Sequence, residues 1–307
     1  MTEQADRREC TFDSTAQLLT RITTQLGTQL HHLHRNGTRR HMSTPHRPTL
    51  VAVAHGSRDP RALQTVTALL ERVRELRPGL RVRLGHIELN APLLTDTLDE
   101  LADRASGQDG GREGEDEAVL VPLLLTRGYH VKHDLPAASA AVRDRLRVRV
   151  ADPLGPHPLL VEALADRLTE AGWTARDHAD GSAGVVLAAA GSRDPESAAD
   201  TRRTARLLSQ RLGGVPVLPA YASAAAPTVA QAVRALAARG RHRTAVASCF
   251  TAPGLFATRS AAAAPWIAAE PLGAHPAMAR LVLHRYDQAV AAAAPPAHPQ
   301  PLELASA

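Results

Sequence analysis

Short apolar runs alternate with longer amphipathic stretches along most of the chain from residue 49 onward. Apolar runs of this length indicate buried strands, and apolar residues at helical spacing indicate helices. In the first part of the chain, strands are predicted at 49–55, 80–89, 118–125 and 147–155. Helices are predicted at 60–76 and 157–171, with two more that begin near Pro92 and Asp134. Strands that alternate with helices in this way predict an α/β fold, with a parallel sheet and helices on its faces.

The same pattern begins again near residue 184. Four matches occur in the same order in both halves: LVAVAHGSRDP (50–60) with GVVLAAAGSRDP (184–195), Pro92 with Pro227, Gly128 with Gly254, and ADPLGPHPLL (151–160) with AEPLGAHPAM (269–278). Collinear matches of this kind indicate an internal duplication. We therefore expect two tandem duplicated domains, each a parallel sheet flanked by helices, with a cleft between them.

The matches place the expected domains at 48–175 and 182–290, the second being a degenerate copy of the first. The glycine-rich, acidic stretch 106–117 is predicted to be a surface loop. Residues 1–47 contain a helical pattern followed by a run rich in histidine and arginine. Two interpretations of this segment remain open, a disordered arm or a stretch preceding a true start at Met42. Residues 291–307 are expected to be a disordered tail.

The net charge of +5 and the sequence pI near 10 raise the question of a nucleic-acid partner. Residues 1–47 carry +3 of this charge, and the other 260 residues carry only +2. Aromatic residues make up only 3% of the chain, so a nucleic acid would find few stacking partners. We therefore expect no nucleic-acid partner.

The sequence also contains signals that bear on the cellular location of the protein. No apolar stretch reaches the roughly 18 residues that a membrane-spanning helix needs. No secretory signal pattern is found at the N-terminus, and Cys10 and Cys249 cannot form a disulfide framework. These features predict a cytoplasmic protein that does not bind a membrane, and we expect it to be a monomer.

Ionisable groups distinguish the two halves. His55 ends the first strand, Glu88 ends the second, and His130 follows the third in the segment TRGYH. The matched residues of the second half are Ala190, Ser223 and Phe256. Because both copies should keep what folding requires, residues that only one copy retains are better candidates for function.

The chemistry of their side chains also makes these three residues candidates for function. The carboxyl ends of parallel strands meet at one edge of a sheet, where ligands bind. Two imidazoles and one carboxylate at such an edge suit a divalent transition metal that is held loosely. The same groups can accept protons near neutral pH. His55, Glu88 and His130 are therefore the predicted metal-binding and catalytic residues.

Elements that both halves keep are expected to be structural. GSRDP occurs in both, with Asp59 suited to cap the following helix and Pro60 suited to its first turn. An anion site at Arg58 is the alternative for this element. His157 and His275, in the repeated PLGxHP element, are predicted to be helix-start or packing residues.

Three other residues have mainly structural interpretations. His86, two residues before Glu88, could hold a site residue in position without binding the metal itself, although a core or solvent-facing role is favoured. Cys249 is predicted to be a buried small residue rather than a nucleophile. Lys132, the only lysine of the chain, is expected to be solvated.

Together, HGSRDP after the first strand, Glu88 in HIELNAP, and VPLLLTRGYHVKHDLP resemble the sirohydrochlorin chelatase family. The resemblance extends over about residues 49–290. It implies two similar α/β domains facing each other across a cleft, where a ferrous or cobaltous ion is inserted into sirohydrochlorin, a tetrapyrrole rich in carboxylates. It also implies that His55 and His130 handle the metal and that Glu88 is the acidic residue.

The resemblance implies further partners. Fe²⁺, or alternatively Co²⁺, would be a metal substrate, and no cofactor would be bound permanently. The carboxylates of sirohydrochlorin require cations at the rim, and four arginines on loops at this edge are the predicted substrate-binding residues: Arg58, Arg127, Arg193 and Arg259. The alternative function is a non-catalytic carrier that stores or delivers nickel or cobalt, which the histidine-rich run near the N-terminus favours.

Overall fold

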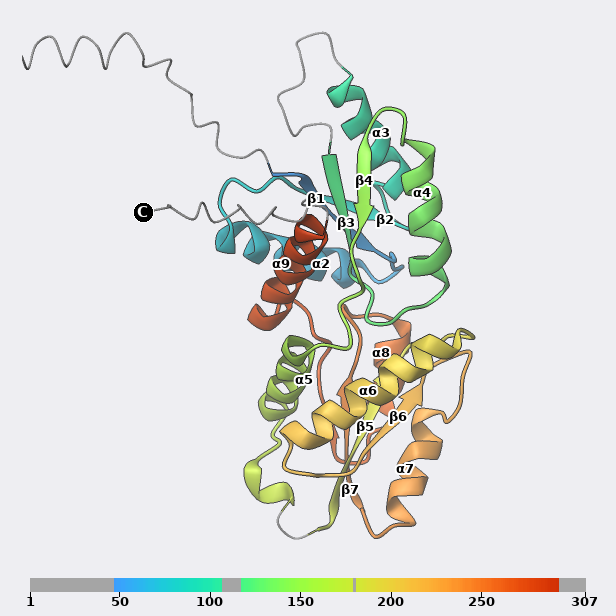
Figure 1. Ribbon diagram of the computed structural model, residues 1–307. Helices are drawn as coiled ribbons and strands as arrows, with labels where there is room; N and C mark the ends of the chain where they lie inside the picture. Colours follow the sequence, from blue (N-terminus) through green and yellow to red (C-terminus); the bar gives the residue numbers. More distant parts are fainter. Residues whose placement is uncertain (1–46, 107–116, 179–180, 293–307) are drawn as a thin grey trace, which may run out of the picture. The chain divides into compact units, whose positions relative to one another are not determined.

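The computed structural model describes residues 47–106, 117–178 and 181–292 (Figure 1). The predicted arm, acidic loop and tail lie outside these ranges, apart from their end residues. Within the described residues the chain forms two four-stranded sheets in which every pair of neighbouring strands is parallel. The predicted α/β class with two duplicated sheets is confirmed.

The first sheet has the strand order β2-β1-β3-β4. Its strands are β1 (Thr49–Ala54), β2 (Val82–His86), β3 (Glu117–Pro122) and β4 (Arg147–Val150). The helices between them are α2 (Pro60–Leu76), α3 (Leu94–Ala105) and α4 (Leu135–Ala141). Successive β1 side chains point to opposite faces, so Leu50 and Ala52 join the core beneath α2, whereas Val51 and Val53 join the core beneath α3 and α4.

The second sheet repeats this arrangement in the order β6-β5-β7-β8. Its strands are β5 (Ala183–Ala189), β6 (Val217–Tyr221), β7 (Arg243–Ser248) and β8 (Ile267–Ala268). The helices α6 (Pro195–Arg211), α7 (Val229–Ala237) and α8 (Leu255–Ala262) follow the same pattern of connections. Val186 and Ala188 pack beneath α7, just as Val51 and Val53 pack beneath α3.

The last helix of each repeat packs on the other repeat. Helix α5 (Pro158–Glu170) packs against β7 and α6, and α9 (Pro276–Ala291) packs against α2 and β3 (Figure 1). The Tyr286 hydroxyl donates a 2.7 Å hydrogen bond to the Pro48 carbonyl, and Arg77 pairs with Asp287 at 2.7 Å. Because each sheet is covered partly by a helix from the other repeat, the two sequence repeats bury their apolar surface together.

The predicted helix starts are confirmed at both repeated elements. The carboxylates of Asp59 and Asp194 accept hydrogen bonds from the first turns of α2 and α6. The Nδ1 atoms of His157 and His275 accept from the backbone at the start of α5 and α9, at 3.1 and 3.2 Å. An imidazole can accept this bond only while that nitrogen carries no proton, so both caps require a neutral histidine.

This requirement gives stability a pH dependence. Burial, with smaller contributions from Arg285 and His284, lowers the pKa of His157 from 6.5 to about 4. As pH falls, the unfolded chain therefore gains its proton before the folded chain does. The stabilising contribution is complete above pH 6.5 and is lost progressively toward pH 4.

We expect a His157→Asn variant to lose less stability than the wild type between these two pH values. Asparagine keeps a capping oxygen but does not titrate in this range. Urea unfolding at a series of pH values measures the effect, with His275 unchanged in both chains. Identical pH profiles for the two chains would contradict the role assigned to the His157 cap.

Candidate active site at the carboxyl edge of the first sheet

The predicted site residues follow three neighbouring strands. His55 comes directly after β1, Glu88 lies two residues after β2, and His130 begins a π-helical turn after β3. Strand β1 lies between β2 and β3 in the sheet, so their carboxyl ends are adjacent. The strand order therefore brings the predicted residues to one edge, as the sequence argument required.

The loops after β1 and β2 are held against each other by the backbone. The Glu88 amide donates to the His55 carbonyl at 3.0 Å, and the Ser57 amide donates to Asn90 Oδ1 at 2.6 Å. Gly56 has a φ of +101°, and a Cβ placed there would lie 1.8 Å from the Glu88 carbonyl oxygen. Only glycine permits this approach, which places Glu88 next to His55.

The second half keeps this scaffold without the ionisable groups. Gly191 has a φ of +91°, and a Cβ there would lie 2.0 Å from the Ser223 carbonyl oxygen. The Ser223 amide donates to the Ala190 carbonyl at 2.9 Å, as Glu88 does to His55. The glycine of GSRDP therefore serves the fold in both halves, and the side chains beside it differ.

The three predicted side chains meet around His55. The Nε2 atom of His55 lies 3.5 Å from Glu88 Oε1, and the rings of His55 and His130 lie edge to face with centroids 4.8 Å apart. His55 Nδ1 lies 3.3 Å from the Gly56 carbonyl oxygen. In the neutral tautomer that donates from Nδ1 to this carbonyl, Nε2 and the Glu88 carboxylate face each other as electron-pair donors.

Asp134 orients His130. The sequence predicts a helix that begins near Asp134, but the chain forms a π-helix at His130–Asp134 that leads into α4. In this turn His130 Nδ1 donates a 2.6 Å hydrogen bond to Asp134 Oδ2. The bond fixes the tautomer of the neutral ring and leaves His130 Nε2 free to bind a cation or a proton.

The three residues do not form a finished metal cage. Within the described ranges, no set of three histidine, cysteine, aspartate or glutamate side chains is arranged to hold a metal ion. His55 and Glu88 are close enough to share an ion, whereas His130 contacts His55 through its ring. Partly exposed ligands in this arrangement suit an ion that arrives and leaves more than one that is retained.

Other expectations about nearby residues are also resolved. His86 is 2% exposed and donates through Nδ1 to the Pro92 carbonyl at 3.1 Å, so of the two roles that the sequence favoured it has the core role. Burial raises the pKa of the Cys249 thiol to about 12, which excludes it as a nucleophile near neutral pH. At the GSRDP element the local ion pair of Asp59 is with Arg61, and Arg58 is exposed.

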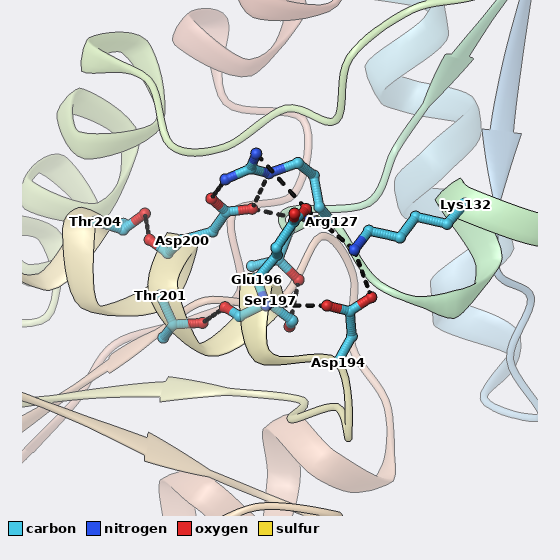
Figure 2. Close-up of polar contacts among 9 residues, drawn as sticks. Arg127, Lys132, Asp194, Glu196, Ser197, Asp200, Thr201 and Thr204 are labelled. Carbon is cyan, nitrogen blue, oxygen red and sulfur yellow. Dashed lines mark hydrogen bonds and ion pairs between the residues drawn. The ribbon is translucent and has the colours of Figure 1, made fainter.

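Arg127 joins the site segment to the second half. Its guanidinium donates to both carboxylate oxygens of Asp200, at 3.0 and 2.6 Å, and its backbone amide donates to the same carboxylate at 3.0 Å (Figure 2). Asp200 lies on α6 and is 2% exposed. This pairing gives Arg127 a structural task, and its role as a substrate-binding cation stays a prediction.

Lys132 is exposed, as expected, but it also forms two ion pairs. Its Nζ atom lies 2.8 Å from Asp194 Oδ2 and 3.0 Å from Glu196 Oε2, at the start of α6 (Figure 2). These carboxylates raise the pKa of Lys132. Thr126 adds a 2.8 Å hydrogen bond to Ser197. The segment 126–132, which carries His130, is therefore fixed along its length by α6.

The remaining predicted rim cations are exposed. Arg58 and Arg193 occupy equivalent places just before the N-caps of α2 and α6. Arg259 was expected on a loop but lies in the last turn of α8, because that helix begins at Leu255. Gly254, at the N-cap of α8, faces Ser57 of the first half, so the start of this helix lies near the loop that follows His55.

Sequence reasoning missed Asp134 and the contacts of Lys132. Asp134 lies four residues after His130, a spacing that allows contact on a helix, but the expected helix began too late to include both. Glu196 and Asp200 replace Arg61 and Thr65 of the first half, so a comparison of the halves could have singled them out.

No helix within the described residues combines the length and the apolar character that crossing a membrane requires.

Comparison with solved structures supports the fold. The structure titled SirB from Bacillus subtilis with Fe³⁺ superimposes with a TM-score of 0.64 at 23% identity, over 80% of this chain and 96% of that one. A structure titled as CbiX, the terminal enzyme for biosynthesis of siroheme in denitrifying bacteria, gives a TM-score of 0.54 at 20% identity, over 80% of this chain and all of that one. At these identities the likeness shows a shared fold.

Comparison with sequences identifies the family. The sequence model of the CbiX family matches residues 49–171 and 184–289, which is most of both halves. A sirohydrochlorin ferrochelatase from Bacillus subtilis (strain 168) is 27% identical over 181 residues, which cover 58% of this chain and 64% of that relative. A sirohydrochlorin cobaltochelatase from Methanopyrus kandleri is 30% identical over 145 residues, which cover 40% of this chain and 95% of that relative. The chain therefore belongs to the CbiX family of sirohydrochlorin chelatases.

Proposed function

We propose that this protein inserts a divalent metal ion into sirohydrochlorin. The observation that carries the proposal is the meeting of His55, Glu88 and His130 at one sheet edge, on a scaffold whose second copy lacks all three groups. Relatives named sirohydrochlorin ferrochelatase and sirohydrochlorin cobaltochelatase support the same activity.

Insertion requires that the ion lose part of its water shell while the ring loses two pyrrole protons. His55 Nε2 and the Glu88 carboxylate, 3.5 Å apart, would present the ion to the ring. His130, held by Asp134 with its Nε2 lone pair free, would bind the ion or accept a proton. With few ligands and partial exposure, these groups can release the ion to the ring nitrogens, which a rigid cage would resist.

Cations near this edge would bind the carboxylates of the substrate. Arg58, Arg193 and Arg259 are exposed, so their guanidinium groups can reach a ligand. Arg127 is already paired with Asp200, so we assign it a smaller share of substrate binding than the other three.

We propose Fe²⁺ as the metal substrate, with Co²⁺ as the alternative. Imidazole and carboxylate ligands accept both ions, and selectivity between them often follows availability. The ferrochelatase from Bacillus subtilis and the cobaltochelatase from Methanopyrus kandleri show that relatives with either name resemble this chain.

An anaerobic assay tests the proposed function. Purified full-length protein is mixed with sirohydrochlorin and either Fe²⁺ or Co²⁺, and the absorption spectrum of the tetrapyrrole reports insertion. We expect a rate above the uncatalysed background that rises in proportion to protein concentration, and the faster ion identifies the metal. A background rate with both ions would contradict the proposal, and tight metal binding without tetrapyrrole binding would favour a metal carrier instead.

A further inference from the structure

A polar cavity lies between the first half and α6. Its volume is about 190 Å³, and it is formed where the chain crosses from β4 to α5, beside α6 and α9. Its charged lining residues are Arg127, Arg203, Arg285, Asp152 and Asp200. Three guanidinium groups therefore face two carboxylates, and Asp200 is already occupied by two hydrogen bonds from the Arg127 side chain.

Arg285 is the unusual member of this lining. It is 9% exposed, and its Nε atom has no hydrogen-bond partner among the described residues. Its Nη1 atom donates to the neutral Gln288 side chain at 2.9 Å. Burial lowers the pKa of Arg285, opposed only by the charge of Asp152. A buried cation with an unused hydrogen-bond donor lowers the stability of the fold unless an acceptor binds that donor.

The duplicated half provides an internal comparison. Arg167 on α5 occupies the position that Arg285 occupies on α9. The Nε and Nη2 atoms of Arg167 both donate to the Leu272 carbonyl, at 3.3 and 3.0 Å, and Nη1 pairs with Glu170 at 2.5 Å. The residue that matches Glu170 is Gln288. Arg167 thus has a carboxylate partner, whereas Arg285 has only the neutral Gln288 and an unused Nε donor.

The cavity beside Arg285 and the cavity beside Arg167 also differ in the charge of their lining residues. The cavity beside Arg167 has Pro253 and Ala68 at the positions that Arg127 and Arg203 occupy in the other. Both cavities keep one exposed acidic residue, Glu270 in one and Asp152 in the other. Asp200 stands where the other cavity has Thr65, so three arginines and two acidic residues line the cavity beside Arg285, against one of each beside Arg167. The lining beside Arg285 thus keeps one more positive charge, and the one hydrogen bond described for the Arg285 side chain goes to the neutral Gln288.

We propose that the cavity beside Arg285 binds a small oxyanion of the size and charge of inorganic phosphate. The anion would accept from Arg285 Nε and from the exposed Arg203 guanidinium, and it would supply the negative charge that Glu170 supplies in the other half. Arg285 lies on α9 and Arg203 on α6, so the bound anion would join these two helices. None of His55, Glu88 and His130 lines this cavity, and the binding proposed here uses Arg285 and Arg203, so it does not depend on the proposed function.

Thermal unfolding of the full chain in sodium phosphate tests the proposal, with sodium chloride at the same ionic strength as the reference. We expect phosphate to raise the unfolding temperature above the chloride value with a saturating dependence on concentration. Isothermal titration with inorganic phosphate then gives the dissociation constant. Equal unfolding temperatures in the two salts would overturn the proposal.

Two comparisons of variants locate the site. Gln288→Glu copies the other half and supplies Arg285 with an internal anion, so the dissociation constant for phosphate should rise at least tenfold. Gln288 is exposed, so the substituted chain should fold. Arg203→Ala should weaken binding similarly, whereas Arg202→Ala, an exposed neighbour outside the cavity lining, should not. Phosphate binding that survives both Gln288→Glu and Arg203→Ala would overturn the proposal.

Discussion

Replacing His130 with alanine is expected to abolish metal insertion while leaving the protein folded. The imidazole is partly exposed, donates a hydrogen bond to Asp134, and has ring contacts with His55 and Tyr129 at the site, so its removal leaves the apolar cores intact. Its Nε2 atom is the group that we assign to binding the ion or accepting a ring proton. Loss of such a group lowers a rate about 100-fold or more. The anaerobic insertion assay measures the rate, and circular dichroism checks the fold.

His133→Ala is the matched control, because His133 is an exposed histidine in the same π-helical turn. Its ring packs on Tyr129, with centroids 4.6 Å apart, and among the described residues the ring of His55 contacts His130 and not His133. This variant should keep most of the wild-type rate. Equal losses in the His130 and His133 variants would show that the turn matters as a structure and would contradict a specific role for His130.

Replacing Arg127 with alanine is expected to destabilise the fold by about 2 kcal/mol, because the buried Asp200 carboxylate would keep only the hydrogen bond from the backbone amide of residue 127. Asp200 is 2% exposed and receives both side-chain hydrogen bonds of the pair from Arg127. Urea unfolding measures the free energy of unfolding. The double variant Arg127→Ala, Asp200→Asn should recover part of the loss, because it leaves no uncompensated charge.

Arg145→Ala is the matched control for this prediction. Arg145 also pairs with two carboxylate oxygens, from Asp99 and Asp103, but all three side chains are exposed. Exposed ion pairs contribute little to stability, so this variant should unfold close to the wild-type midpoint. Similar midpoints for the Arg127 and Arg145 variants would contradict the importance of the buried partner.

Local sequence signals predicted the elements well because the forces that set them act over a few residues. Helix α2 occupies the predicted range 60–76, since Asp59 caps it and Pro60 begins it. The exchange of α5 and α9 between the sheets was not predicted. Both helices carry an apolar face that suits either sheet, and only the packing of the whole chain selects one.

The sequence predicted the three ionisable residues of the site but not the partners that orient them. The difference between the halves identified His55, Glu88 and His130, and the strand order explains why they meet. Asp134 was missed as a partner because its contact depends on a π-helical turn that the apolar pattern does not encode. The ion pairs of Lys132 were missed because they require the two halves to be in contact.

The central claim is that one half of the duplicated chain carries the chemistry on a scaffold that both halves share. The most direct measurement is the single-turnover insertion rate of a chain that combines His55→Ala, Glu88→Ser and His130→Phe. These substitutions give the first half the side chains that the second half has at the matched positions Ala190, Ser223 and Phe256. The loops that carry the first two have the same backbone geometry in both halves, and the third lies in the π-helical turn of the first half and in α8 of the second. We expect a folded protein whose insertion rate equals the uncatalysed background. Insertion at the wild-type rate by this variant would contradict the assignment of the site.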